Sequence, residues 1–140
     1  MDSRFYWQIH QLAFLLEKRA DTALKTQLGI GFAQYKVLEA INQNMLTKQN
    51  VVAELLDQTE ASVSRQVTIL KKKGLIVVNV VMGNKRAKEL SLTRVGDDVV
   101  RQAEDILDVT QAQITGSVSY QEQRLVSELI DRMLSKAKKT

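Results

Sequence analysis

The chain has 140 residues, enough for one domain with its own hydrophobic core. It contains no cysteine, which excludes disulfides and thiolate metal sites, and no proline, so long helices can run without interruption. The formal net charge is +4, and no apolar run approaches the ~20 residues that a membrane span needs. The first residues also lack the basic region and cleavage site of a signal peptide. We therefore expect a cytoplasmic protein with no membrane partner.

Two helices are predicted in the first third of the chain. Apolar residues recur at helical spacing from Ser3 to about Leu28, and Gly29 is a natural stop. A second helix is expected from Phe32 to about Asn42, with Gly31 at its cap. Each of these helices has one apolar face, which it should bury against the rest of the domain.

A tight link separates two further predicted helices. Thr47 can cap a third helix, which ends near Leu56 and has valines and leucines on its apolar side. Thr59 can cap a fourth helix, which runs from Glu60 to about Lys73. Two short helices joined in this way are typical of a helix-turn-helix.

The two sides of the fourth helix differ in chemistry. At about 100° per residue, Val63, Val67 and Leu70 fall on one side, which can pack on the domain. The opposite side is small, polar and basic, and Arg65 there can form two hydrogen bonds to guanine or contact a phosphate. A helix with these properties is suited to the DNA major groove. On the fourth helix we predict a DNA-binding face that consists of Ala61, Ser62, Ser64, Arg65, Thr68 and Lys72.

A β-hairpin is predicted after the fourth helix. The β-branched residues between Ile76 and Leu92 favour strands, and Gly83 and Asn84 supply the turn. Lys85 and Arg86 lie at its tip, where a wing would contact the minor groove or the DNA backbone. We therefore add these two residues to the predicted DNA-binding set.

Positive charge is concentrated in this part of the chain. Between residues 60 and 88 there are seven lysines and arginines and a single acid, Glu60. A focused charge of this kind attracts phosphates. An isolated run of lysines is more often a solvated face, but its place in a helix-turn-helix favours DNA binding here.

Two long helices are expected in the last third of the chain. Thr93 can cap a fifth helix, whose apolar stripe begins with Val95 and Val99 and which ends at Gly116. Residues Ser119 to Glu122 form a capping-box pattern that opens a sixth helix. The apolar stripes are broader than one chain needs to cover. We infer that the first, fifth and sixth helices also bury surface against a second copy; ordinary packing within one chain is the alternative.

Three segments of the sequence resemble the MarR family, the multiple-antibiotic-resistance-type regulators of bacteria and archaea: residues 28–38, 63–76 and 90–96. Together, and in this order, they extend the resemblance over essentially the whole chain. It implies a mainly α-helical winged helix-turn-helix with a small β-hairpin wing and long N- and C-terminal dimerisation helices. Residues 1–140 would then form one domain, with a DNA-binding lobe at 30–92 and a helical dimerisation lobe at 1–29 and 93–140.

The resemblance also implies a function. Family members are homodimers, usually repressors, that bind pseudo-palindromic operators with half-sites about one turn, roughly 10 bp, apart. Many release double-stranded DNA when a small, often aromatic or phenolic, ligand binds between the dimer helices and the DNA-binding lobe. This chain departs from the family at three positions. Asn84 precedes Lys85 and Arg86 where the family often has an aspartate, Val78 replaces a common arginine, and Gly31 replaces a Thr or Ser cap.

Other readings of the sequence have less support. No glycine-rich phosphate loop, nucleophile motif or Cys/His pair is present, so we expect neither an enzyme nor a cofactor. Glu104 and Asp108, at i and i+4, can ligate a metal in a metal-responsive regulator or enzyme, although solvated acids are commoner. Phe5, Tyr6, Trp7 and Phe14 are expected in core or dimer packing, which is commoner than a cofactor site. His10 is expected to be packed or at the surface; lining an effector pocket or a dimer interface is the alternative. A winged helix that dimerises and binds protein without specific DNA binding is the remaining alternative.

Overall fold

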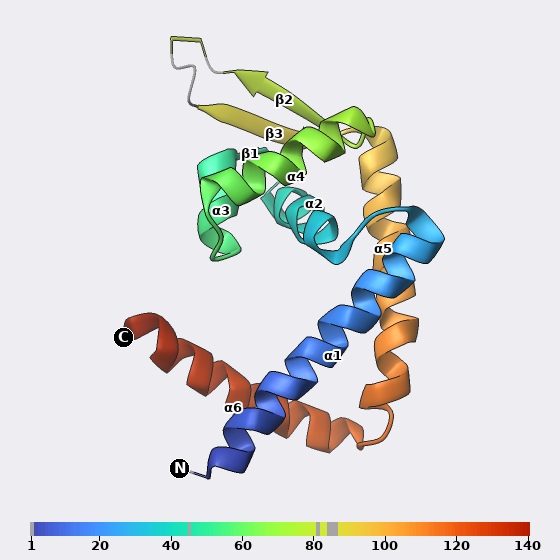
Figure 1. Cartoon of the computed structure of the whole chain (residues 1–140), viewed down its shortest axis with the longest axis vertical. Helices are drawn as coiled ribbons and strands as arrows, with labels where there is room; N and C mark the ends of the chain where they lie inside the picture. Colours follow the sequence, from blue (N-terminus) through green and yellow to red (C-terminus); the bar gives the residue numbers. More distant parts are fainter. Residues whose placement is uncertain (1, 45, 81, 84–86) are drawn as a thin grey trace.

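The computed structural model describes residues 2–44, 46–80, 82–83 and 87–140. Helices dominate it, and its strands form one small antiparallel sheet, so the expected mainly α-helical winged helix-turn-helix class is confirmed. None of the helices in the described part of the chain is long and apolar enough to span a membrane. In chain order the elements are α1 (Ser3–Leu28), α2 (Phe32–Asn44), β1 (Thr47–Lys48), α3 (Gln49–Leu55), α4 (Glu60–Lys72), β2 (Ile76–Val80), β3 (Lys88–Leu92), α5 (Arg94–Thr115) and α6 (Tyr120–Lys139) (Figure 1).

The first two helices begin where the sequence predicts. Gly29 ends α1 in the left-handed conformation, at φ 67°, and its N–H donates to the Lys25 carbonyl. Glycine adopts this conformation without the steric cost of a Cβ. Helix α2 continues two residues beyond the predicted Asn42, to Asn44. The Asn44 side-chain amide donates to the Ala40 carbonyl at 2.8 Å, which satisfies an acceptor in the last turn.

The predicted cap of the third helix is wrong. Thr47 is buried in β1, where it pairs with Leu90 of β3. Helix α3 therefore begins two residues later, at Gln49, and Lys48 before it makes no side-chain cap hydrogen bond. The backbone of Thr47 finds its partners in the sheet, so strand pairing overrides the local capping signal.

The wing hairpin is confirmed, and β1 adds a strand to it that the sequence did not predict. The strand order is β1-β3-β2, with Ile76 opposite Leu92 and Val78 opposite Leu90. Because side chains alternate between the two faces of a strand, Ile76 and Val78 turn towards the core while Val77 is exposed. The family's arginine position, occupied here by Val78, is thus a packing position in this chain.

One core joins the helices and the sheet. Helix α5 contributes Val100, Ala103 and Leu107, together with the backbone of Gly96. Val95, predicted on this stripe, is instead 58% exposed, because the helix turns the neighbouring Gly96 towards the core. The largest fully buried side chains are Leu24, Ile30, Leu38, Ile41, Leu70 and Leu90.

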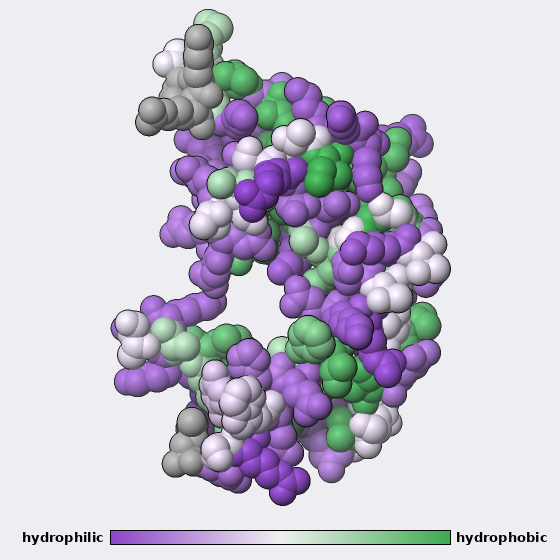
Figure 2. Space-filling view, viewed as in Figure 1, coloured by the Kyte–Doolittle hydropathy of each residue, from purple (hydrophilic) through white to green (hydrophobic). Residues whose placement is uncertain are grey.

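Helix α6 and the first half of α1 remain outside this core. The capping box at Ser119 and Glu122 is present as predicted, with both reciprocal hydrogen bonds, and α6 begins after it. No residue of α6 is buried, and every described residue of α1 before Leu16 is exposed. In the view of Figure 1, α6 crosses the N-terminal half of α1. Figure 2 shows hydrophobic side chains at the surface in this part of the molecule. These two segments therefore carry apolar side chains that the described part of the chain leaves exposed.

Candidate nucleic-acid interface

Helix α4 docks on the domain through its apolar side. Val63 and Leu70 are fully buried, and Val67 is 5% exposed. The side-chain oxygen of Thr59 accepts a hydrogen bond from the Ser62 N–H at 3.1 Å, which confirms the predicted cap. The helix is therefore held at its start and along its back, and its opposite side faces solvent.

The six predicted α4 residues lie on this solvent-facing side and its edges. Ser62 and Ser64 are half-buried at the edges of the front. Arg65 stands in the middle of it and forms no ion pair with a described residue. That these residues contact DNA stays a prediction. The exposed residues on the front are Ala61, Arg65, Thr68 and Lys72.

Local hydrogen bonds orient two hydroxyls at this surface. Ser62 Oγ donates to Gln58 Oε1 at 3.3 Å, and Thr68 Oγ1 donates to the Ser64 carbonyl at 3.0 Å. Each hydroxyl keeps acceptor lone pairs, with which it can accept from an amino group at a base edge. Gln58 joins the surface through its bond to Ser62, a role that the sequence did not predict. A polar residue directly before an N-cap is the signal that would have indicated it.

The lysines at the end of α4 have different partners. Lys73 Nζ donates to the Gly29 carbonyl at 2.5 Å and lies 3.5 Å from Gln34 Oε1. It therefore ties the end of α4 to the end of α1. Lys71 and Lys72 are exposed, and neither pairs with an acid in the described part of the chain. Of the three lysines at the end of α4, these two have no side-chain hydrogen-bond partner among the described residues, so their ammonium groups are available to a phosphate.

Lys72→Ala and Lys73→Ala should therefore have different effects. We expect Lys72→Ala to weaken binding to all DNA sequences alike and to flatten the slope of log affinity against log salt by about 0.9, the contribution of one phosphate contact. Lys73→Ala should leave the slope unchanged and lower the free energy of unfolding by about 1 kcal/mol, since it removes a hydrogen bond to a carbonyl. Fluorescence anisotropy at several salt concentrations and urea unfolding measure the two quantities. The assignment is wrong if Lys73→Ala is the variant that flattens the slope.

The predicted tip of the wing lies outside the described residues. Asn84, Lys85 and Arg86 all fall there, so their DNA contacts stay predictions. The neighbouring turn residues are described: Met82 is fully exposed, and Gly83 has a φ of +87°. Gly83 therefore has the left-handed backbone expected of a turn residue, and Asn84, the other predicted turn residue, lies outside the described residues.

A second group of polar side chains lies between α2 and α5. Burial and the neighbouring carboxylate of Glu39 raise the pKa of Glu104. Burial also raises the pKa of Tyr35 to about 12, and the charges of Glu39, Glu104 and Asp108 add to this effect. Within the described ranges, no third ligand joins Glu104 and Asp108 to make a metal site. The carboxylates of Glu39, Glu104 and Asp108 place negative charge where the two helices pack, and the Tyr35 phenol stays neutral beside them.

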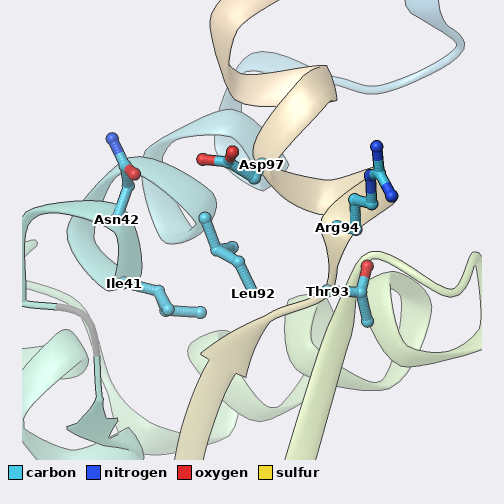
Figure 3. Close-up of a pocket in the computed structure, with 6 residues that line it drawn as sticks. All are labelled: Ile41, Asn42, Leu92, Thr93, Arg94 and Asp97. Atoms are coloured by element: carbon cyan, nitrogen blue, oxygen red, sulfur yellow. The ribbon is translucent and has the colours of Figure 1, made fainter.

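A shallow pocket of about 290 Å³ lies where α2, β3 and α5 meet (Figure 3). Asn42, Thr93, Arg94 and Asp97 are its polar lining residues, and Figure 3 shows the Arg94 side chain turned away from Asn42 and Asp97. The Asp97 carboxylate is already paired with Arg101, one turn further along α5. Among the six lining residues there is no nucleophile with a neighbouring base, so the pocket has no arrangement for covalent catalysis. Its lining residues are Ile41, Asn42, Leu92, Thr93, Arg94 and Asp97.

No protein-family model matches this sequence. Solved structures do match the fold. A MarR/EmrR family transcriptional regulator from Acinetobacter sp. ADP1 has a TM-score of 0.84 and 24% identity, with 99% of this chain and 98% of that chain covered. A mutant MarR from E. coli complexed with operator DNA has a TM-score of 0.84 and 20% identity, with 94% of each chain covered. The S. aureus MepR–DNA complex has a TM-score of 0.81 and 24% identity, with 95% of this chain and 97% of that chain covered. The chain therefore has the fold of the MarR-family transcriptional regulators over nearly its whole length.

Proposed function

We propose that the protein is a sequence-specific DNA-binding transcriptional regulator, and that α4 is its reading helix. The observation that carries the proposal is the front of α4, which is exposed, small, polar and basic while the back of the same helix is buried. A helix of this kind can approach base edges through its small residues and attract phosphates through Lys71 and Lys72. Two of the structures that share the fold are DNA complexes, which supports the proposal.

We also propose that it acts as a homodimer, with residues 1–29 and 93–140 as the dimerisation lobe and residues 30–92 as the DNA-binding lobe. An apolar surface as extensive as that on α6 and the first half of α1 is typical of an interface. A second copy is the occupant that fits, because a two-fold dimer presents two reading helices to a pseudo-palindromic operator. The apolar residues of α6 that are between 41% and 56% exposed are Leu125, Val126, Leu129, Ile130, Met133 and Leu134.

Ile130→Glu should convert the dimer to a monomer at micromolar concentration. The substitution places a carboxylate in the apolar stripe of α6, and desolvating it without a partner costs about 3 kcal/mol or more in each protomer. A weakening of at least about 100-fold in the dimer dissociation constant follows. Ser135→Glu is the matched control, because it introduces the same side chain on the opposite side of α6. Sedimentation equilibrium measures the constant; a dimer that tolerates Ile130→Glu as well as Ser135→Glu does not use this stripe.

A small aromatic or phenolic effector that releases DNA is the third part of the proposal. A groove of about 520 Å³ runs along α1 beside Thr110 of α5. Leu15 gives it an apolar wall, and Lys18 and Arg19 give it positive charge. A groove with this mixture of surfaces suits a small aromatic ring that carries an acidic group. Benzoic acids and phenols that bind there should lower the affinity of the protein for its operator.

Selection from random-sequence duplex DNA at two salt concentrations tests the proposed function. Enrichment of an inverted repeat with half-sites about one turn apart is the expected result for a dimeric regulator. Weak, salt-sensitive binding without an enriched sequence would show attraction to phosphates but no reading of bases. Absence of any binding would contradict the proposal and favour a winged-helix protein that binds other proteins.

A further inference from the structure

Helix α2 begins without a side-chain cap of its own. Its first intrahelical hydrogen bond runs from the Tyr35 N–H to the Gly31 carbonyl at 3.0 Å, which makes Gly31 the N-cap residue. Glycine has no side chain with which to accept a hydrogen bond from the first turn. Gln34, three residues later, supplies only half of a capping box: its Oε1 accepts from the Gly31 N–H at 3.4 Å.

The missing acceptor comes from α1. Asp21 Oδ1 accepts a hydrogen bond from the Phe32 N–H at 2.9 Å, and Oδ2 of the same carboxylate lies 2.9 Å from Lys25 Nζ. The bond to Lys25 and the bond to the Phe32 N–H lower the pKa of Asp21, which keeps the carboxylate charged. Its negative charge also faces the positive end of α2. One helix therefore caps the next across the α1–α2 loop.

The space around Gly31 fits this arrangement. Gly31 is buried, and its backbone φ is not positive. A Cβ at this position would lie 3.1 Å from Asp21 Oδ1 and 3.4 Å from the Lys25 side chain. A Cβ here would require the Asp21 carboxylate to move by a few tenths of an ångström. Glycine at this position leaves room for the close approach of Asp21.

We propose that Asp21 is a positioning residue that fixes the angle between α1 and the DNA-binding helices. Helix α2 packs against α4, so a bond from α1 to the start of α2 also constrains the reading helix. The inference rests on the proposed function, since it concerns how a dimer holds two α4 helices apart. When the Asp21 bond fixes the angle between α1 and the DNA-binding helices, the dimer should bind operators of one half-site spacing. Without that bond, it should bind operators of several spacings.

The position of Asp21 along α1 makes it effective for this purpose. Helix α1 has 26 residues and is about 39 Å long at 1.5 Å per residue. Asp21 lies near one end, and the exposed apolar half that we assign to the dimer interface lies at the other. A small change in the angle between α1 and α2 at Asp21 therefore becomes a large displacement of one α4 helix relative to the α4 helix of the second copy.

Two variants separate the capping of α2 from the hydrogen bond between α1 and α2. Asp21→Ala removes the cap of α2 and the bond to α1 together, because one carboxylate supplies them. Adding Gly31→Ser to Asp21→Ala restores a cap from within α2, because serine at the N-cap and Gln34 at the third helical position complete a capping box. The added Cβ also has room, since the oxygen 3.1 Å away is absent from the double variant. The double variant thus keeps a capped helix and keeps the bond from Lys73 to the Gly29 carbonyl, and it lacks the bond from α1 to the start of α2.

Affinity is measured for the enriched inverted repeat and for repeats with one base pair added to or removed from the spacer. We expect the wild type to lose at least about tenfold in affinity on the altered spacings. The double variant should unfold at the same urea concentration as the wild type and bind the original repeat about three- to tenfold more weakly, because fewer of its conformers are competent. It should also distinguish the spacings by less than about threefold.

Two single variants control for charge. Asp21→Asn keeps an oxygen that can accept from the Phe32 N–H and should retain most of the spacing discrimination. Lys25→Met removes the ion pair but leaves the hydrogen bond to α2 in place, and it should behave like the wild type. Loss of discrimination in Lys25→Met alone would move the role from the Asp21 hydrogen bond to the ion pair.

A distance measurement tests the same point without DNA. Because the chain has no cysteine, single cysteines can be introduced for spin labels at exposed Glu17 of α1 and Lys72 of α4. In protein diluted with an unlabelled excess, the double variant should show a broader intrachain distance distribution than the wild type. An unchanged distribution, or wild-type spacing discrimination in the double variant, would show that Asp21 only caps α2. Failure of the wild type to enrich any inverted repeat contradicts the proposed function instead, and the distance measurement still decides the role of Asp21.

Discussion

Arg65→Ala is expected to weaken binding to the enriched operator by about 1–3 kcal/mol, or roughly five- to 150-fold. Arg65 is exposed in the middle of the front of α4, and the small residue Ala61 precedes it by one helical turn. The helix can therefore approach the floor of the major groove closely enough for the guanidinium to reach a guanine. Removing it should relax the preference at one operator position in each half-site.

The measurement is the affinity of each variant for operators with single-base substitutions. Arg65→Lys separates base reading from phosphate contact, because lysine keeps the charge but cannot form the two parallel bonds to guanine. If Arg65 reads a base, Arg65→Lys should lose most of the discrimination at the same position as Arg65→Ala. If it contacts a phosphate, Arg65→Lys should restore much of the affinity. An Arg65→Ala protein that binds its operator as tightly as the wild type would remove Arg65 from the interface.

The elements that the sequence predicts well are those whose signals are local. Thr59, Thr93 and Ser119 each cap the helix that follows them, as predicted, because the donor and the acceptor are three residues apart. The front and the back of α4 are also predicted correctly, since the period of a helix alone decides which residues share a side. The same argument identifies the candidate DNA-binding residues of α4 without knowledge of the rest of the fold.

The errors and omissions depend on partners that are distant in the chain. Thr47 carries a good capping signal, yet it is a strand residue because Leu90 pairs with it. Lys73 has the same side chain as Lys72 but a different role, because the Gly29 carbonyl lies 44 residues away in sequence. The cap that Asp21 supplies to α2 crosses 11 residues. No local pattern encodes these three contacts, so only the folded structure could show them.

Gly96→Ala is expected to be among the most destabilising single substitutions in this chain, by about 3–5 kcal/mol. A Cβ at Gly96 would lie 2.0 Å from the backbone oxygen of Leu75 and 2.9 Å from its carbonyl carbon. Neither helix nor turn can move away easily. The Leu75 carbonyl accepts a hydrogen bond from the Thr93 N–H at 3.0 Å, and Thr93 Oγ1 donates to the Gly74 carbonyl at 2.7 Å. The added methyl group must break or stretch both hydrogen bonds.

Gly29→Ala is the matched control, because it adds the same methyl group where no atom lies within 4 Å. Gly29 has a φ of +67°, so its substitution should cost only the backbone strain, about 1 kcal/mol. Urea unfolding of both variants measures the difference, and circular dichroism shows whether Gly96→Ala folds at all. Equal losses in the two variants would contradict a tight contact between α5 and the turn after α4. A much larger loss at Gly96 would show that α5, in the proposed dimerisation lobe, packs directly against the backbone of Leu75, three residues after the end of α4.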